Sequence, residues 1–428
     1  MRTLADTLAD LGRHPLAVPW RIRLHRTWGT ASSPREFVVF APALGRSVWP
    51  VLARAHNASL LSNPAAVEVV APLPEAELEP ALSRVRAVHQ VPFFVAPAPV
   101  ESRRQLDVPS VDRPVLQQPG PGLALGLDIG GTSMKVVAMR AEAVVGSAGG
   151  ATWPPGEFGI ESLIRRSRAL LVEAAAGEAV GSLGIGLAAP LGVGGQVLEL
   201  STILRERVGS TSAFDGFAER VADGLVEGPV VCFNDLSTLG RYLSAGGARR
   251  LVRVQIGTSF GGCWIDADGD VVATEMGRLV VDVGPDALAH TYLPLTGAMR
   301  TYLSNLGVGH VLAACGIEAV PAEAGLALRA ALEAGNPAGA EVVRRLAAVM
   351  VGVLQEFAAL LVGMQAVECG GSMLQGPAGA LLQAEVGKSS PLPFRVAARP
   401  GEDGAIAAAL APRVAAPLRG LRRIGPGR

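Results

Sequence analysis

The sequence predicts an α/β protein with a duplicated two-lobe body and an extra small α/β domain at its N-terminus. Patterns typical of strands and of helices alternate along most of the chain. A strand, a glycine-rich turn and a second strand occur near residue 128 and again near residue 257, as a duplicated fold would produce. Hydrophobic residues make up 49% of the 428 residues and aromatic residues only 4%, so the core is expected to consist mainly of Ala, Val, Leu and Ile.

Residues 1–95 are predicted to form the small domain, which a proline-rich linker at 96–122 separates from the main body. In the small domain, strands are expected at 37–42, 67–73 and 91–96, and helices at 47–56 and 75–88. The linker contains six prolines and no sustained apolar period, so it could let the domain move relative to the body. The sequence leaves the role of this domain open.

The main body spans 123–428, with lobes expected at about 123–245 and 246–410. Its strands are expected at 123–128, 135–140, 143–146, 182–188, 229–233, 251–256, 262–266, 271–274 and 366–369. Helices are expected at 160–176 and 236–243, through most of 297–365, and from about residue 403. Apart from the repeated strand–glycine turn–strand unit, the body shows no short-period repeat.

Composition and charge exclude several function classes. The formal net charge is zero, which gives no reason to expect a nucleic acid or an anionic membrane as partner. Residues 1–19 lack the apolar core of a signal peptide, and the apolar run at 346–362 contains Gln355 and Glu356, as a buried helix would. The four cysteines are widely spaced, so free thiols are expected rather than a zinc site or disulfides. These features predict a cytoplasmic protein.

The strongest functional signal is the string LDIGGTSMK, in which a strand ends at Asp128 and a second strand begins near Lys135. At the tip between them, Gly130 and Gly131 let the backbone approach phosphate oxygens closely, and Thr132 adds a hydroxyl. Asp128 could hold Mg²⁺ directly or through water. Two glycines alone would fit an ordinary hairpin turn. The spacing excludes a P-loop, and the strand after the glycines excludes a dinucleotide-binding fingerprint.

This string resembles the first phosphate motif of the ROK (repressor, open reading frame, kinase) and hexokinase-like families of the actin/hsp70 ATPase superfamily. The resemblance implies nucleotide contacts at Asp128, Gly130, Gly131, Thr132 and Lys135. The string VQIGTSFGG resembles their second phosphate motif, which implies phosphate contacts at Gly257, Thr258, Ser259 and Gly261. Ser259 stands where the family usually has Gly, so it adds both a hydroxyl and a Cβ. Alone, this turn would also fit a purely structural hairpin.

Asn234 and Asp235 close one predicted strand and open a helix. A lone Asn-Asp pair at such a place fits a helix cap. Sugar kinases that resemble this chain place a catalytic carboxylate here, after an Asn that binds a substrate hydroxyl. Because phosphoryl transfer to an alcohol needs a group that accepts the hydroxyl proton, the resemblance implies Asp235 as the base and Asn234 as a substrate ligand.

The string VECGGS resembles the family's adenosine motif, which implies nucleotide contacts at Gly370, Gly371 and Ser372. A simple strand-to-helix turn is the alternative. The segment EDGAIAAA at 402–409 resembles the closing helix of the family, where small residues permit close packing near the nucleotide. The resemblance covers roughly 123–410, and it implies an actin-like, ribonuclease H-like ATPase fold that binds ATP and Mg²⁺.

The substrate side departs from the family pattern. Typical ROK kinases carry Glu-x-Gly-His followed by a Cys/His zinc cluster, whereas this chain has Glu275-Met-Gly-Arg278 and no such cluster afterwards. If Glu275 and Arg278 face substrate, the guanidinium favours an acceptor with a carboxylate or another anionic group. Alternatively, Arg278 forms a structural ion pair with Asp282 or Glu275.

The resemblance implies an ATP- and Mg²⁺-dependent kinase that phosphorylates a hydroxyl of a sugar or sugar-like small molecule. Two alternatives share the fold: a ROK-type sugar-sensing regulator and a non-catalytic ATP-binding protein. A regulator usually has a basic N-terminal winged helix, whereas residues 1–120 contain 13 Arg and 10 acidic residues in a β–α alternation. The presence of both Asp128 and Asp235 argues against loss of catalysis. Kinases of this type are often homodimers, and the sequence leaves the oligomeric state open.

Overall fold

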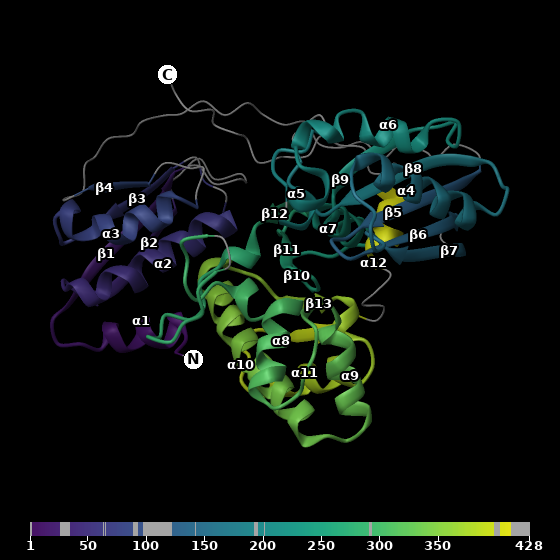
Figure 1. Cartoon of the computed structure of the whole chain (residues 1–428). Helices are drawn as coiled ribbons and strands as arrows, with labels where there is room; N and C mark the ends of the chain where they lie inside the picture. Colours follow the sequence, from purple (N-terminus) through teal and green to yellow (C-terminus); the bar gives the residue numbers. More distant parts are fainter. Residues whose placement is uncertain are drawn as a thin grey trace.

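The computed structural model describes residues 2–25, 35–62, 64, 66–88, 93–96, 122–141, 143–191, 196–200, 202–290, 293–397 and 403–411. These residues form an N-terminal unit and two lobes, each built around its own β-sheet (Figure 1). The linker predicted at 96–122 lies outside the described residues except at its two ends.

The N-terminal unit contains a four-stranded sheet in the order β2-β1-β3-β4. Its elements are α1 (Leu4–Gly12), β1 (Ala17–His25), β2 (Arg35–Pro42), α2 (Gly45–Ser62), β3 (Ala66–Val70), α3 (Glu75–Arg86) and β4 (Phe93–Ala96). Strand β1 pairs antiparallel with both neighbours, and it buries Trp20, Ile22 and Leu24 completely. Arg21 and Arg23 alternate with them on the other face, as a half-buried strand requires. The expected β–α alternation is therefore present, with α1 and β1 added to it.

The first lobe has a five-stranded sheet in the order β7-β6-β5-β8-β9. Its strands are β5 (Leu123–Ile129), β6 (Ser133–Arg140), β7 (Ala143–Ala151), β8 (Val180–Leu187) and β9 (Val230–Asn234). The helices that follow in this part of the chain are α4 (Ile160–Ala175), α5 (Thr202–Val208) and α6 (Phe217–Ala222). Strands β5, β6 and β7 form an antiparallel meander, and β8 and β9 join it in parallel.

The second lobe repeats this plan in the order β12-β11-β10-β13-β14. Its strands are β10 (Leu251–Ile256), β11 (Phe260–Ile265), β12 (Val271–Thr274), β13 (Ala366–Gly370) and β14 (Phe394–Val396). Its helices are α8 (Asn305–Ala314), α9 (Ala324–Glu333), α10 (Pro337–Leu360) and α11 (Pro377–Gly387). An antiparallel meander is again extended by two parallel strands, so the predicted duplicated fold is confirmed.

Two helices connect the lobes. Helix α7 (Asp235–Ala245) follows β9 and contacts strands of both sheets. Helix α12 (Asp403–Leu410) comes last in the described chain but packs on β5 in the first lobe, where Figure 1 shows it in yellow among the strands. A Cβ on Gly126 would lie 2.0 Å from the Ala405 carbonyl oxygen, so glycine is needed for this close approach. The first lobe is thus discontinuous in sequence, which differs from the expected lobe boundaries.

The N-terminal unit and the second lobe share one hydrophobic core, whereas the first lobe has a core of its own. The shared core extends from Leu4 and Trp20 through Trp264 to Phe357. Within it, the Trp264 indole Nε1–H donates to the Leu61 carbonyl at 2.8 Å. The N-terminal unit is therefore packed against the second lobe. The sequence suggested that the proline-rich linker could let this unit move relative to the body, whereas these contacts join the unit to the second lobe.

Among the described residues, no helix combines the length and the apolar character that crossing a membrane requires. The longest helix, α10, carries the fully buried carboxylate of Glu356, in keeping with the buried helix expected at 346–362. All four cysteines are free thiols, as expected from their spacing.

Candidate active site between the two hairpins

The first predicted phosphate hairpin joins β5 and β6. Its turn is closed by a hydrogen bond from the Gly130 N–H to the Ser133 carbonyl, at 3.0 Å. The buried Thr152 supports the tip, because its hydroxyl donates to the Gly130 carbonyl at 2.8 Å and its N–H donates to the Thr132 carbonyl at 3.0 Å. Thr152 thus bonds the tip from the buried side, while the Thr132 side chain is exposed. A ligand can therefore reach the Thr132 hydroxyl.

The second predicted phosphate hairpin joins β10 and β11 in the same way. The Gly257 N–H donates to the Ser259 carbonyl at 2.9 Å, and the Asn305 N–H donates to the Gly257 carbonyl at 2.8 Å. The two tips meet, since the Thr132 and Thr258 hydroxyl oxygens are 2.9 Å apart and share a hydrogen bond. The structure therefore brings together two motifs that the sequence separates by a whole lobe.

Asn234 and Asp235 lie where β9 ends and α7 begins. The Asn234 Oδ1 accepts from the N–H groups of Leu236 at 3.1 Å and Ser237 at 3.0 Å, so Asn234 is the helix N-cap. Its Nδ2 donates to the Ala189 carbonyl at 3.2 Å. These bonds give Asn234 a structural task that the substrate-ligand prediction did not include, and the predicted substrate contact stays a prediction.

Asp235 is the first residue of α7, and its Oδ1 accepts from the Leu236 N–H at 2.9 Å. Burial raises the pKa of Asp235 to about 7, with the negative charges of Asp128 and Glu275 adding to the effect. Gly186 on β8 shows how close the two aspartates are: a Cβ there would lie 3.5 Å from the Asp235 Cα and 3.7 Å from the Asp128 Oδ1. A carboxylate with a pKa near neutrality is suited to accept and release a proton.

Asp128 stands at the end of β5, directly opposite Lys135 in the antiparallel register, so both side chains are on one face of the sheet. Helix α12 presses against the carboxylate, because a Cβ on Gly404 would lie 2.5 Å from the Asp128 Oδ2. Among the described residues, no group of three or more His, Cys, Asp and Glu side chains is placed to hold a metal. Asp128 and the neighbouring Asp235 are thus two carboxylates without a third metal-ligating partner of these types in the described part of the chain, and the predicted Mg²⁺ contact of Asp128 stays a prediction.

Glu275 precedes a short 3-10 turn at Met276–Arg278, and Arg278 is its last residue. Arg278 forms ion pairs with Glu275 at 3.7 Å and with Glu199 at 3.4 Å. Asp282, the other partner considered from the sequence, accepts instead from the Tyr302 hydroxyl at 2.8 Å. An ion pair with Glu275 was one expected alternative, and it is present. Glu199 was missed because it lies in a segment without a recognisable motif.

Two further basic side chains belong to this region and were also missed. Burial lowers the pKa of Arg300, and the nearby charges of Glu275 and Arg278 act on it in opposite directions. Burial also lowers the pKa of His290, to about 4, with a further contribution from Arg300 and Arg278. Because no local pattern connects these positions in the sequence, only the fold brings them together.

The Gly-Gly turn at the end of β13 is tightly packed. Gly371 has a φ of 117°, and a Cβ there would lie 1.8 Å from the Ile256 carbonyl oxygen. A Cβ on Gly370 would lie 2.1 Å from an Nη of Arg253, which is fully buried and paired with Glu368 at 2.7 Å. Ser372 begins the short turn that follows. The protein's own packing thus explains both glycines, and the predicted nucleotide contacts stay a prediction.

Close packing also explains why residue 261 is a glycine. A Cβ on this residue would lie 2.4 Å from the Leu236 Cδ1, in the first turn of α7. The second hairpin is therefore packed against the helix that begins with Asp235. This contact connects the predicted phosphate site of one lobe with the predicted base of the other.

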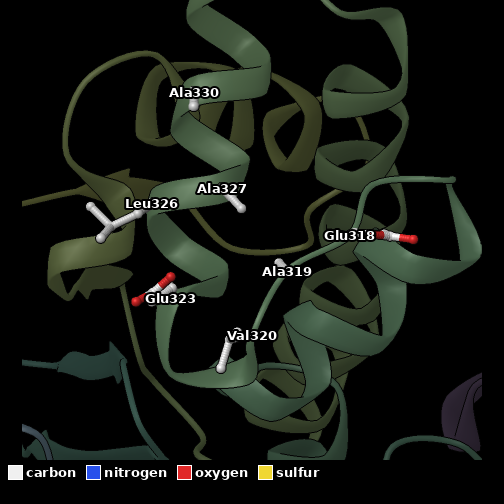
Figure 2. A pocket seen from close by; sticks show the side chains of 7 residues that line it. All are labelled: Glu318, Ala319, Val320, Glu323, Leu326, Ala327 and Ala330. Carbon is white, nitrogen blue, oxygen red and sulfur yellow. The ribbon is translucent and has the colours of Figure 1, made fainter.

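A separate hollow of about 650 Å³ lies on the second lobe, as Figure 2 shows. It is lined by Glu318, Ala319, Val320, Glu323, Leu326, Ala327 and Ala330, from α9 and the segment before it. The lining includes two carboxylates and no basic side chain, so it has nothing that would attract phosphate. None of the predicted site residues lines this hollow.

No family model matches the chain, and no curated protein does. Among solved structures it is similar to a ROK family glucokinase from Streptomyces griseus in complex with glucose and AMPPNP, with 23% identity, 68% of this chain and 98% of that chain covered, and a TM-score of 0.54. It is also similar to a ROK hexokinase from Thermus thermophilus, with 21% identity, coverage of 68% and 97%, and a TM-score of 0.48. A ROK family transcriptional regulator, a homolog of the E. coli MLC protein, matches with 14% identity, coverage of 68% and 77%, and a TM-score of 0.49. The glucokinase match shows that the chain has the fold of a ROK sugar kinase.

Proposed function

We propose that this protein is an ATP- and Mg²⁺-dependent kinase that phosphorylates a hydroxyl of a sugar or sugar-like small molecule. The observation that carries the proposal is Asp235, a partly buried carboxylate whose pKa is raised to about 7. It lies beside Asp128, at the start of a helix that packs against the second hairpin. The ROK sugar-kinase fold supports the same reaction class.

The residues at the two tips suit a nucleotide triphosphate. Thr132, Thr258 and Ser259 place hydroxyl groups next to the contact between the tips, and Gly130 leaves the backbone there without a side chain. Asp128 would be the protein's ligand to Mg²⁺. When bound, Mg²⁺-ATP supplies the transferable phosphoryl group and offsets its negative charge.

Asp235 is proposed to accept the proton of the acceptor hydroxyl. The Leu236 N–H fixes one carboxylate oxygen, and the Asn234 cap fixes the start of the helix, so the carboxylate has a defined orientation. A pKa of about 7 leaves a substantial ionised fraction at neutral pH and still gives a basic carboxylate.

The acceptor is proposed to carry an anionic group in addition to its hydroxyl. Arg278 and Glu275 both lie close enough to Arg300 for their charges to act on the pKa of Arg300, and Arg278 also pairs with Glu275. Arg278 reaches its carboxylate partners at 3.4 and 3.7 Å, which are long distances for a charge-assisted hydrogen bond. A substrate carboxylate or phosphate could therefore replace them as a closer partner.

The test is ADP formation with Mg²⁺-ATP against a panel of neutral sugars, amino sugars, sugar acids, sugar phosphates and polyols. Wild type and Asp235→Ala are compared on the whole panel. Acceptor-dependent turnover that disappears in the variant is the expected result, with sugar acids or sugar phosphates preferred. Tight ATP binding without turnover on any acceptor would contradict the proposal and favour a sensor or a non-catalytic ATP-binding protein.

A further inference from the structure

The N-terminal unit holds the chain segment that follows Glu275. From helix α2, the His56 Nε2 lies 2.8 Å from the Arg278 carbonyl oxygen. The neighbouring Asn57 bonds both backbone groups of Val280: its Nδ2 donates to the carbonyl, and its Oδ1 accepts from the N–H, each at 2.8 Å. A single side chain thereby satisfies both backbone groups of a buried residue.

The start of the chain holds the same segment through its backbone. The Leu4 N–H donates to the Val281 carbonyl at 2.9 Å, and the Val283 N–H donates to the Arg2 carbonyl at 3.1 Å. The Arg2 N–H also donates to the Asp282 Oδ1 at 3.2 Å. Residues 278–283, named here the clamped segment, are thus bonded both to α2 and to the backbone of Arg2 and Leu4.

The α2 contacts are anchored in the second lobe. Glu356 of α10 is fully buried and accepts from the Asn57 Nδ2 and from the Arg54 Nη2, each at 2.9 Å. His56 is fully buried, and burial lowers its pKa to about 4, so its ring is neutral at pH 7. Because the Arg278 carbonyl can only accept, the Nε2 of His56 carries the hydrogen. Loss of either side chain would leave buried backbone groups without a partner.

We propose that the N-terminal unit forms the fixed wall on the acceptor side of the active site, and that His56 and Asn57 are positioning residues for Glu275 and Arg278. This inference rests on the proposed kinase function. His56 and Asn57 act through the clamped segment, whose first residue is Arg278 itself. The hairpin tips are hydrogen-bonded to other residues, Thr152 and Asn305, so nucleotide binding is expected to be retained when the bonds of His56 and Asn57 are lost.

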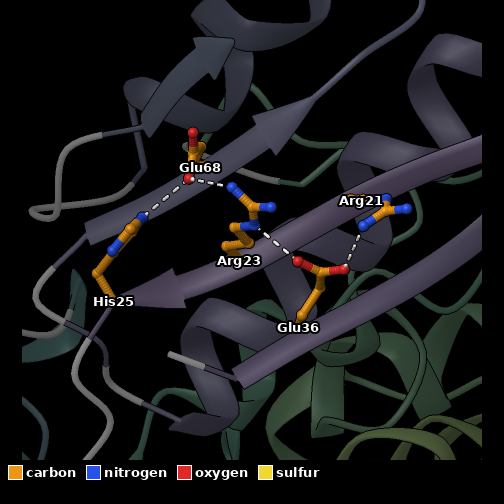
Figure 3. Close-up of polar contacts among 5 residues, drawn as sticks. All are labelled: Arg21, Arg23, His25, Glu36 and Glu68. Atoms are coloured by element: carbon orange, nitrogen blue, oxygen red, sulfur yellow. Dashed lines mark hydrogen bonds and ion pairs between the residues drawn. The ribbon is translucent and has the colours of Figure 1, made fainter. Parts of the chain in front are cut away.

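The kinetic test compares two identical substitutions in the full chain, His56→Leu and His25→Leu. His25 belongs to the same unit but pairs with Glu68 on the outward face of the sheet, as Figure 3 shows. With His56→Leu, the acceptor KM is expected to rise about tenfold, and the ATP KM is expected to stay unchanged. With His25→Leu, both KM values should stay as in wild type. His56→Gln, which keeps an N–H donor, should restore much of the acceptor affinity.

A second measurement does not depend on turnover. In Asn57→Ala, amide hydrogen exchange at Val280 is expected to become faster by at least tenfold, because its N–H loses the Oδ1 acceptor, while a cooperative thermal transition shows that the variant is folded. Unchanged exchange at Val280 would overturn the clamp. A rise in both KM values with His56→Leu, or the same change with His25→Leu, would overturn the positioning role. If wild type uses no acceptor at all, the kinase proposal and the acceptor wall both fail, and hydrogen exchange still decides whether the clamp exists.

Discussion

The two lobes share one sheet plan but are stabilised differently. The first lobe has a core of its own, and α12, from the C-terminal end of the described chain, packs on its sheet. The second lobe shares its core with the N-terminal unit. Asp128 and Asp235 come from strand ends of the first lobe, whereas Glu275 and Arg278 belong to the second. The comparison teaches that a duplicated fold can keep two equivalent hairpins while an added unit packs against only one of the lobes.

Asp235→Asn should have the largest effect on turnover. It should also show that the residue needed for activity in the first lobe lowers the stability of the protein. Turnover is expected to fall by about 10²–10⁴ as the proton acceptor is lost. The folded pKa of Asp235, about 7, is above its ordinary value of 3.8, so wild type loses stability as pH rises from about 4 to about 7. The variant is free of that loss, so it should be more stable than wild type at pH 8.

Thermal unfolding at pH 5 and pH 8, together with the pH profile of turnover, checks this prediction. Wild-type activity should rise with pH and level off above about 7, where Asp235 is ionised. Asp286→Asn is the matched control, since this aspartate is exposed on the surface. A variant that is less stable than wild type at pH 8 would show that Asp235 is a structural residue.

Arg54→Met tests the connection between the N-terminal unit and the second lobe. Arg54 forms an ion pair at 2.9 Å with Glu356, whose pKa is raised by burial and lowered by Arg54. Without Arg54, a buried carboxylate loses its counter-charge, and the free energy of unfolding is expected to fall by about 3–5 kcal/mol. The loss should become smaller as pH falls, because protonation neutralises Glu356.

Urea unfolding across the pH range measures this effect. Arg140→Met is the control in the first lobe, where Arg140 forms an exposed ion pair with Glu178 and a change below about 1 kcal/mol is expected. Equal effects of the two substitutions would contradict the idea that the second lobe depends on the N-terminal unit for its stability.

Gly126→Ala tests the way in which α12 completes the first lobe. The new methyl group would lie 2.0 Å from the Ala405 carbonyl oxygen and 2.3 Å from the Ala409 N, so the helix must move away from β5. Such overpacking is expected to lower the free energy of unfolding by about 1–3 kcal/mol. Gly387→Ala, on α11 of the second lobe, is the control, because a Cβ there meets nothing within 4 Å. If the two variants are equally stable, α12 accommodates the new methyl group at position 126 without a loss in the free energy of unfolding.

Much of the two-lobe body could be predicted from the sequence, because its signals are local. The hairpin with Gly130 and Gly131, the strand that ends at Asn234 and the helix from Asp403 all lie where the pattern placed them. Strand β1 was missed although Trp20 and Ile22 alternate with arginines, since Pro19 and the charged residues mask the pattern.

What could not be predicted depends on contacts distant in sequence. Glu199, His290 and Arg300 have no motif, and they join Arg278 only through the fold. The hydrogen bond of His56 to the Arg278 carbonyl spans 222 positions of the chain. Periodicity reports which face of an element is buried, but it does not report which element covers that face. The placement of the N-terminal unit therefore required the structure.

Of these substitutions, Gly257→Ala should change the stability and the turnover of the protein least. It compares the two hairpins directly. A Cβ on Gly130 would lie 3.0 Å from the Ser133 carbonyl oxygen, whereas a Cβ on Gly257 would lie 4.0 Å from the nearest atom, the Ser259 carbonyl oxygen. Packing therefore explains the glycine in the first hairpin but not the one in the second. If Gly257 is glycine so that phosphate can approach its backbone, Gly257→Ala should leave the thermal midpoint unchanged and raise the ATP KM several-fold, while the acceptor KM stays constant. An unchanged ATP KM would mean that the second hairpin does not contact the nucleotide at this residue, and the resemblance between the two hairpins would then be one of fold alone.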